Sequence, residues 1–121
     1  LTWANENLQE LEAIHLLDGR ELINDRMIGT IVSMLSSSKS INPKPLLGYA
    51  KTLSGKIKIS MRLSRFQDTQ IDLSNLLNEV VKNVEPQSEV GGHAVAAGAI
   101  ISENSLIDFI AQVNQRILKG I

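Results

Sequence analysis

The sequence contains no cysteine, only two histidines and few aromatic residues: one Trp, one Tyr and two Phe. Without cysteine, disulfides, thiolate metal sites and cysteine nucleophiles are all excluded. No apolar run approaches the ~18 residues that a membrane-spanning helix needs, and no signal-peptide pattern is present. These absences predict a cytoplasmic protein without a membrane partner.

The net charge of −1 conceals an uneven distribution of charged residues along the chain. Between Asp25 and Asp68 every charged residue is basic, namely Arg26, Lys39, Lys44, Lys51, Lys56, Lys58, Arg62 and Arg65. The rest of the chain holds only four of the 12 basic residues and all 13 acidic ones. Such segregation favours a face that attracts polyanions, although lysines scattered over a solvated surface are the simpler alternative.

The spacing of apolar residues predicts the secondary structure. We expect strands at about 13–17, 45–50, 56–64 and 99–101, and helices at about 24–37, 72–86 and 103–120. Because the order of strands and helices is mixed, the expected fold is α/β, a single domain with a mixed β-sheet covered by helices. The chain begins with Leu1 rather than Met, so we expect residues 1–12 to be a helix or linker from an upstream domain, and residues 13–121 to form the domain itself.

The strand expected at 56–64 has the clearest alternation in the sequence. Its apolar residues point one way, and its polar residues point the other way, as period-two geometry requires: Ile57, Ile59, Met61 and Leu63 against Lys56, Lys58, Ser60, Arg62 and Ser64. One side of this strand therefore belongs to the core, and the other is a row of hydrogen-bond donors.

Gly91-Gly92-His93 is followed by small residues up to Gly98. Paired glycines in a loop let the backbone approach a ligand closely and direct successive N–H groups at an anion, and a histidine adds a further donor. On its own this is a weak signal, because glycine pairs are most often turns. The spacing also differs from that of the Walker and dinucleotide-binding motifs.

The basic strand Lys56–Arg62, followed some 30 residues later by Gly91–Gly98, resembles the DHH-associated domain of the DHH phosphoesterases. This is the C-terminal substrate-binding domain of a family that includes RecJ-type single-strand exonucleases, and the resemblance extends to the archaeal RecJ-like members. Two positions depart from the family pattern. Val90 replaces the first of three glycines that many members have, and Ala94 stands where many have proline.

The resemblance implies that the Gly91 and Gly92 amides, His93 and Arg62 contact substrate phosphate. Ser60 and Ser64 would supply hydroxyl donors, and Lys56 and Lys58 would extend the contact along the backbone. The expected partners are single-stranded DNA or RNA and an upstream DHH catalytic domain. No catalytic residue, metal ligand or cofactor is expected in this chain, and the manganese or magnesium of the family would be held by the catalytic domain.

Two other functions remain open at this stage. The chain also resembles a non-catalytic, RecJ-related replication protein that associates with GINS and the replicative helicase. A less favoured alternative is the related C-terminal domain of alanyl-tRNA synthetases. We expect His15, Trp3, Tyr49 and Phe66 to have packing roles rather than to bind a ligand.

Overall fold

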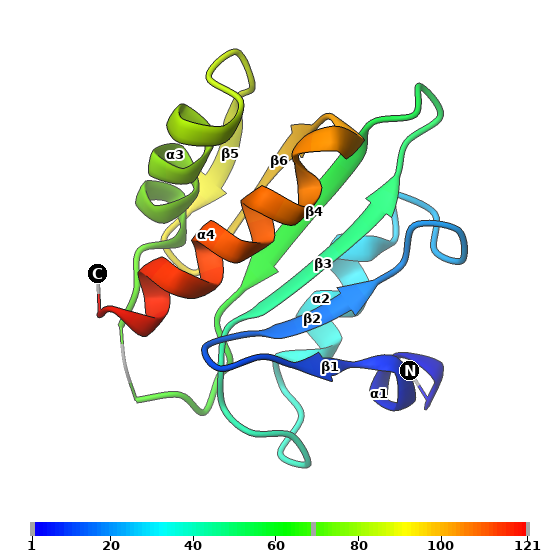
Figure 1. The fold of residues 1–121 in the computed structure, drawn as a ribbon. Coiled ribbons are helices and arrows are strands. Elements are labelled where there is room, and N and C mark those ends of the chain that lie inside the picture. Colours follow the sequence, from blue (N-terminus) through cyan, green and yellow to red (C-terminus); the bar gives the residue numbers. More distant parts are fainter. Residues whose placement is uncertain (1, 69, 121) are drawn as a thin grey trace.

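The computed structural model describes residues 2–68 and 70–120. Leu1, the first residue of the predicted segment 1–12, and Ile121, the last residue of the predicted domain 13–121, lie outside the described residues. Six strands form one mixed sheet in the order β1-β2-β3-β4-β6-β5 (Figure 1). Only β2 and β3 pair in parallel; every other neighbouring pair is antiparallel. The strands are β1 (Gln9–Glu10), β2 (His15–Asp18), β3 (Leu46–Lys51), β4 (Ile57–Arg62), β5 (Val90–His93) and β6 (Ala96–Ile101). The predicted α/β class with a mixed sheet is confirmed.

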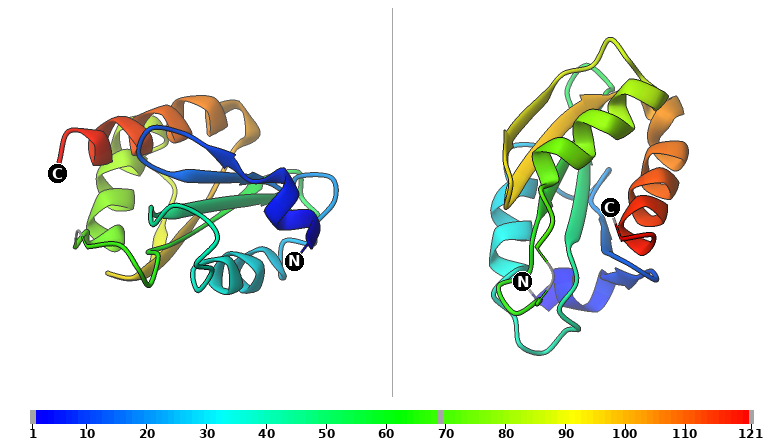
Figure 2. Two further views of the ribbon diagram at one scale, coloured as in Figure 1. Left: turned by 90° about the horizontal axis from the view of Figure 1, so that it is seen from below. Right: turned by 90° about the vertical axis from the view of Figure 1, so that its left-hand side faces the viewer.

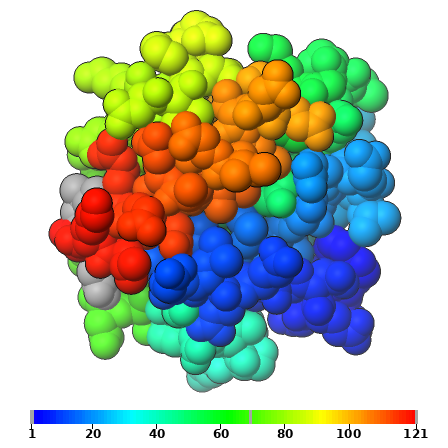
Figure 3. All heavy atoms as spheres, viewed as in Figure 1, coloured from blue at the N-terminus to red at the C-terminus, as the bar shows by residue number. Residues whose placement is uncertain are grey.

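Helices cover the two faces of the sheet unequally. The helices α3 (Leu73–Val84) and α4 (Leu106–Leu118), preceded by the short 3-10 helix η1 (Glu103–Ser105), lie on one face. The shorter α2 (Ile28–Leu35) and α1 (Thr2–Asn7) lie on the other, so the domain has three layers (Figure 2). Figure 3 shows how the side chains of α4 close over the middle of the first face. No helix among the described residues is long and apolar enough to cross a membrane.

The larger core cluster lies between the sheet and the helices α3 and α4. Alternate residues of β4 and β6 point into it, and Phe109 of α4 is its largest fully buried side chain. Asp72 begins α3 by accepting a hydrogen bond from the backbone N–H of Asn75 at 3.0 Å, which satisfies a free amide of the first turn. A smaller cluster under α1 and α2 contains Leu17, Val32 and Leu46.

Residues 2–10 pack against the same sheet as the rest of the domain. Ala4 of α1 is buried in the smaller cluster, and β1 pairs with β2. Just after β1, the side chain of Asn114 in α4 holds the chain in place: its Oδ1 accepts from the N–H of Ala13 at 2.9 Å, and its Nδ2 donates to Glu12 at 3.1 Å.

Two local predictions are wrong. Asn24 and Asp25 do not begin the first long helix, because α2 begins at Ile28. The Asn24 side chain instead accepts from the N–H of Arg26 at 2.9 Å and forms a turn before the helix. Gly91 and Gly92 do not form a loop either: they belong to the edge strand β5, which a two-residue turn joins to β6. Glycine has low strand propensity, which hid this strand in the sequence.

Candidate phosphate-binding groove

On the α2-facing side of the sheet, the described helices leave β5 and β6 largely uncovered. Helix α2 packs on β3 and β4, whereas α3 packs on β5 and β6 from the opposite side. Gly48 of β3 lets α2 approach closely, since a Cβ atom there would lie 2.5 Å from Cγ2 of Val32. In the left view of Figure 2, α2 lies beneath β3 and β4, and β5 extends beyond it. A strip of β4, β6 and β5 therefore stays open beside the helix.

An open groove of about 610 Å³ runs along this strip. Its lining comes from three parts of the chain: the turn and helix around α2, the strand β4, and the β5–β6 hairpin. The lining residues are Arg26, Gly29, Thr30, Ser33, Met34, Lys58, Ile59, Ser60, Met61, Arg62, Gly91, Gly92, Ala96, Ala97 and Gly98. We call this cavity the basic groove.

Strand register places the predicted residues in rows across the sheet, at and beside the groove. Arg62 of β4 is opposite Ala96 of β6, which is opposite His93 of β5. The next row on the same side of the sheet, two residues back along β4, joins Ser60, Gly98 and Gly91. Directly paired residues point to the same side of a sheet, and strands lie about 4.8 Å apart, so Arg62 and His93 flank Ala96 across about 10 Å.

The basic groove has an uncompensated positive charge. Arg26, Lys58 and Arg62 line it without an acidic residue, and none of the three makes an ion pair with a residue in 2–68 or 70–120. Four basic residues elsewhere are paired: Arg20 with Asp18, Lys44 with Glu10, Lys51 with Glu103 and Arg116 with Glu79. The others, Lys39, Lys56, Arg65, Lys82 and Lys119, make no ion pair within residues 2–68 and 70–120. A concave wall lined by charges of one sign concentrates counter-ions, so the groove attracts anions.

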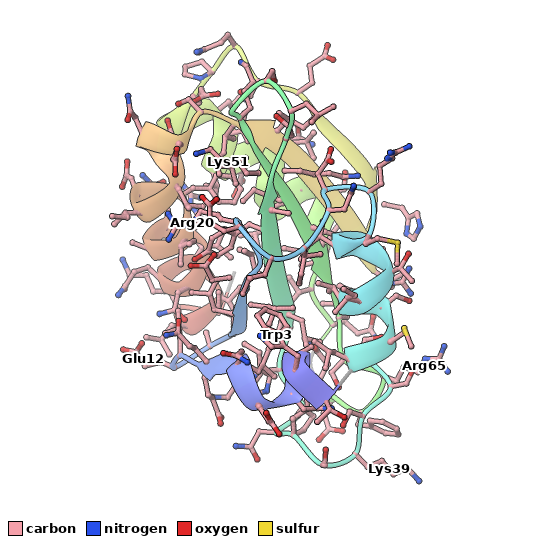
Figure 4. The ribbon with its side chains drawn as sticks, turned by 90° about the vertical axis from the view of Figure 1, so that its right-hand side faces the viewer. Trp3, Glu12, Arg20, Lys39, Lys51 and Arg65 are labelled. Atoms are coloured by element: carbon pink, nitrogen blue, oxygen red, sulfur yellow. The ribbon has the colours of Figure 1, made fainter. Side chains whose placement is uncertain are left out.

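Arg20, which follows β2, and Lys51, at the end of β3, are two of the paired basic residues (Figure 4). Arg20 donates to both carboxylate oxygens of Asp18, at 3.2 and 3.0 Å, and lies over the ring of Tyr49. Burial, with a smaller contribution from Asp18, raises the pKa of Tyr49 to about 12. Tyr49 is therefore a buried structural residue, held beneath a guanidinium that is already neutralised.

The glycines of the groove have different roles. A Cβ on Gly91 would meet nothing within 4 Å, so this residue leaves open space over the floor. Gly92 has a φ of +109° and a Cβ there would overlap the carbonyl oxygen of Ala96, so the backbone itself requires glycine. A Cβ on Gly98 would lie 2.5 Å from the carbonyl oxygen of Ile59. At these glycines the floor is bare backbone, within reach of a ligand.

The structure brings together five of the eight predicted residues in the basic groove: Lys58, Ser60, Arg62, Gly91 and Gly92. Lys56 lines an adjoining groove that shares Lys58 and Gly91 with the first. His93 is exposed at the end of β5, in the same row as Arg62, but outside the residues that line the groove.

Ser64 does not share the groove, contrary to the sequence prediction. Strand β4 ends at Arg62, and the following turn buries Ser64. Its hydroxyl accepts from the N–H of Phe66 at 3.1 Å, and its own N–H donates to Gln67 at 2.9 Å. The alternation of the strand therefore stops before this residue, and its polar groups are used within the turn.

Sequence reasoning missed the wall that α2 contributes. The sequence pattern places Arg26 in the basic segment but does not predict Thr30 and Ser33 as lining residues. Positions 30 and 33 lie three residues apart on one face of α2, which is a signal of a shared surface. The signal is weak because uncharged hydroxyls on a short helix are typical of ordinary solvent exposure.

The other histidine, His15, lies outside the groove, and the lining of the groove contains no His, Asp or Glu side chain among the described residues. His15 is buried, and its Nε2 lies 2.7 Å from the carbonyl oxygen of Asn42. Within residues 2–68 and 70–120, no three His, Asp or Glu side chains gather in a way that suits a metal ion. The described residues therefore do not fit the two-metal site that the family resemblance implies for the catalytic domain.

Known structures share this fold at low sequence identity. The C-Ala domain of Aquifex aeolicus alanyl-tRNA synthetase is 15% identical, with a TM-score of 0.64, over 89% of this chain and 95% of that one. A pGpG-specific phosphodiesterase from Vibrio cholerae is 14% identical (TM-score 0.68), and a DHH-domain structure described as a member of a ribosomal-protein family is 15% identical (TM-score 0.67). Each match covers 98% of this chain, but the chain spans only 37% and 29%, respectively, of those two proteins.

At the level of sequence, the chain matches a family but no curated protein: no curated protein sequence matches it significantly. The model of the DHHA1 domain family, in contrast, matches residues 13–119, which include every residue that lines the basic groove. The chain belongs to the DHHA1 domain family.

Proposed function

We propose that the basic groove binds the phosphate backbone of a single-stranded nucleic acid. The observation that carries this proposal is the set of three unpaired cations, Arg26, Lys58 and Arg62, around a floor of exposed glycine backbone with no acidic residue in its lining. Phosphate is the anion that such a surface suits, because guanidinium groups and backbone amides both donate to its oxygens.

Each groove residue has a defined task in this proposal. Arg62 engages phosphate oxygens with its planar fork, while Ser60 donates from the neighbouring row and Lys58 contributes a point charge. His93, exposed at the end of the Arg62 row, adds a donor at the rim. These contacts read the backbone and not the bases, so binding through them is independent of sequence.

We further propose that the domain serves a RecJ-like DHH phosphoesterase by holding the strand beside a catalytic domain. A structural neighbour that is a pGpG-specific phosphodiesterase, and so acts on a dinucleotide, supports this assignment. Manganese or magnesium in the catalytic domain would supply the hydrolytic chemistry, and no step of it is assigned to this chain. The coding sequence upstream of Leu1 tests the assignment: an Asp-His-His motif supports it, whereas its absence favours the GINS-associated assembly role.

Titration of a fluorescent single-stranded oligonucleotide, followed by anisotropy at low salt, tests the groove. Arg62→Ala should weaken binding about 10- to 100-fold, since a hydrogen bond to a charged group contributes about 1.5–3 kcal/mol. His93→Ala should weaken it less, and both effects should be alike across sequences. Arg116→Ala is the matched control, because Arg116 pairs with Glu79 on the helix-covered side.

The salt dependence provides a second readout of the same contact. Each phosphate neutralised on a single strand contributes about −0.7 to the slope of log affinity against log salt concentration. Arg62→Ala should therefore make the slope shallower by about 0.7, and Arg116→Ala should leave it unchanged. Titrations in which the Arg62 and His93 variants both match the parent at low salt would place the binding site elsewhere.

A further inference from the structure

A second open groove, of about 620 Å³, continues from the basic groove along the sheet. The two share Lys58, Ile59, Gly91 and Gly98, so they form one continuous surface across β4, β6 and β5. The remaining lining residues of the second groove are Lys56, Gln87, Ser88, Glu89, Ala99 and Ile100. We call it the adjoining groove.

Ile100 gives the adjoining groove an apolar floor. The open face of β6 carries only small residues, Ala96 and Gly98, until it reaches Ile100, whose exposure is 47%. The next residue, Ile101, points to the other face and is fully buried in the larger core cluster. Helix α2 packs on β3 and β4, so the exposed part of the Ile100 side chain is free to contact a ligand on the open face.

The polar residues of the adjoining groove differ from those of the basic groove. Glu89 lines only the adjoining groove, and its carboxylate repels phosphate. A carboxylate accepts hydrogen bonds from the amino and imino groups on the edge of a base, and the amide of Gln87 both donates and accepts. An apolar platform with an acceptor and an amide at its rim is suited to a nucleobase rather than to a phosphate.

The strand geometry relates this platform to the proposed phosphate contact. Ile100 is paired with Lys58, which is four residues from Arg62 along β4, or about 13 Å. A stacked strand rises only about 3.4 Å per nucleotide. A phosphate held by Arg62 and a base held on Ile100 therefore belong to different nucleotides, and Lys58 lies where the backbone passes between the two grooves.

From this arrangement we infer that the adjoining groove is a nucleobase subsite, with the base lying on Ile100 and its edge toward Glu89 and Gln87. The inference rests on the proposed function of the basic groove. It makes the ligand an oligonucleotide of at least two nucleotides, recognised by one base as well as by its backbone, rather than a free phosphate or a mononucleotide.

Calorimetric titration with a 5′-phosphorylated tetranucleotide, and with two analogues that each lack one base, tests the inference. Ile100→Ala should weaken binding of the complete tetranucleotide about five- to tenfold, the loss expected when contact with one or two methylene groups disappears. The same variant should leave the affinity unchanged for the analogue that lacks the base on Ile100. Ile107→Ala is the matched control, because Ile107 is 84% exposed on α4.

Arg62→Ala separates this inference from the proposed function, because it should weaken binding of all three ligands. If Arg62→Ala weakens all three and Ile100→Ala weakens none, or weakens all three equally, the base subsite is wrong and the phosphate contact stands. If Arg62→Ala weakens none of the ligands, the proposed function itself is wrong.

Discussion

On one side of β4, Ile57, Ile59 and Met61 are each at most 1% exposed and pack under α3 and α4. On the other side, Lys58, Ser60 and Arg62 line the basic groove, and each remains partly exposed. The two sets alternate residue by residue along the same six positions. Burial of apolar area on the first side stabilises the fold, whereas the second side keeps its charges unpaired and accessible.

This difference indicates that stability and binding can be changed separately within a single strand. Neighbouring residues, only one position apart, should respond to substitution in different assays. The same contrast applies beyond β4: Glu85, at the end of α3, belongs to the helix-covered side, and Gly91 of β5 belongs to the open side.

The largest effect is expected from the neighbours Ile59 and Ser60. Ile59→Ala removes a fully buried side chain and should lower the free energy of unfolding by about 2–5 kcal/mol. Ser60→Ala should change it by no more than about 0.5 kcal/mol while weakening oligonucleotide binding. Urea denaturation followed by circular dichroism measures the first quantity. Equal destabilisation by the two variants would show that the open side also supports the fold.

Glu85, at the end of α3, should make the helix-covered side sensitive to acid. Burial alone would raise its pKa, but hydrogen bonds from Ser102, Ser88 and Ser105 outweigh it and lower the pKa from 4.5 to about 2. The stabilisation is therefore complete above pH 4.5 and is lost as the pH falls towards about 2. The shift corresponds to about 3 kcal/mol.

Unfolding free energies of the parent and of Glu85→Gln, measured between pH 7 and pH 2, test this prediction. The difference between the two should narrow by about 3 kcal/mol as the pH falls through this range, because the glutamine amide of the variant does not titrate. Oligonucleotide affinity at pH 7 should be the same for both proteins. A difference in stability that stays constant with pH would contradict the account of the carboxylate.

Substitutions of the adjacent glycines Gly91 and Gly92 should also separate stability from binding, with smaller changes in the free energy of unfolding. Gly92→Ala should lower the free energy of unfolding by about 1–3 kcal/mol, because alanine is strained at a φ of +109° and its Cβ meets the carbonyl of Ala96. Gly91→Val should leave stability nearly unchanged, since its side chain enters open space, but it should obstruct the groove and weaken binding. Thermal unfolding and anisotropy measure the two effects. Unimpaired binding by Gly91→Val would show that the ligand does not cross this part of the floor.

The sequence predicted the parts of the groove that strong periodicity defines. Alternation in β4 placed Lys58, Ser60 and Arg62 on one side, and the structure confirms that placement. It failed where a strand ends, because nothing in the pattern shows that the chain turns after Arg62 and buries Ser64. It also failed for β5, whose pairing with β6 depends on contacts between strands rather than on local propensity.

The wall of the groove could not be predicted from the sequence for a different reason. Which strands α2 covers depends on its close approach to Gly48, a contact between residues distant in the chain. This packing leaves β5 and β6 open and places Arg26 in the lining of the same groove as Gly91 and Gly92. A local pattern predicts the faces of an element but not the neighbour against which each face packs.

Titration of the 15N-labelled protein with a short single-stranded oligonucleotide, followed by amide NMR shifts, tests the central claim most directly. The account predicts that the largest changes occur at Ser60, Gly91, Gly92 and Gly98 on the open side of the sheet. The amides of α4, residues Leu106–Leu118, should remain unchanged. Largest changes along α3 and α4, with the three glycines unaffected, would contradict a binding site in the basic groove.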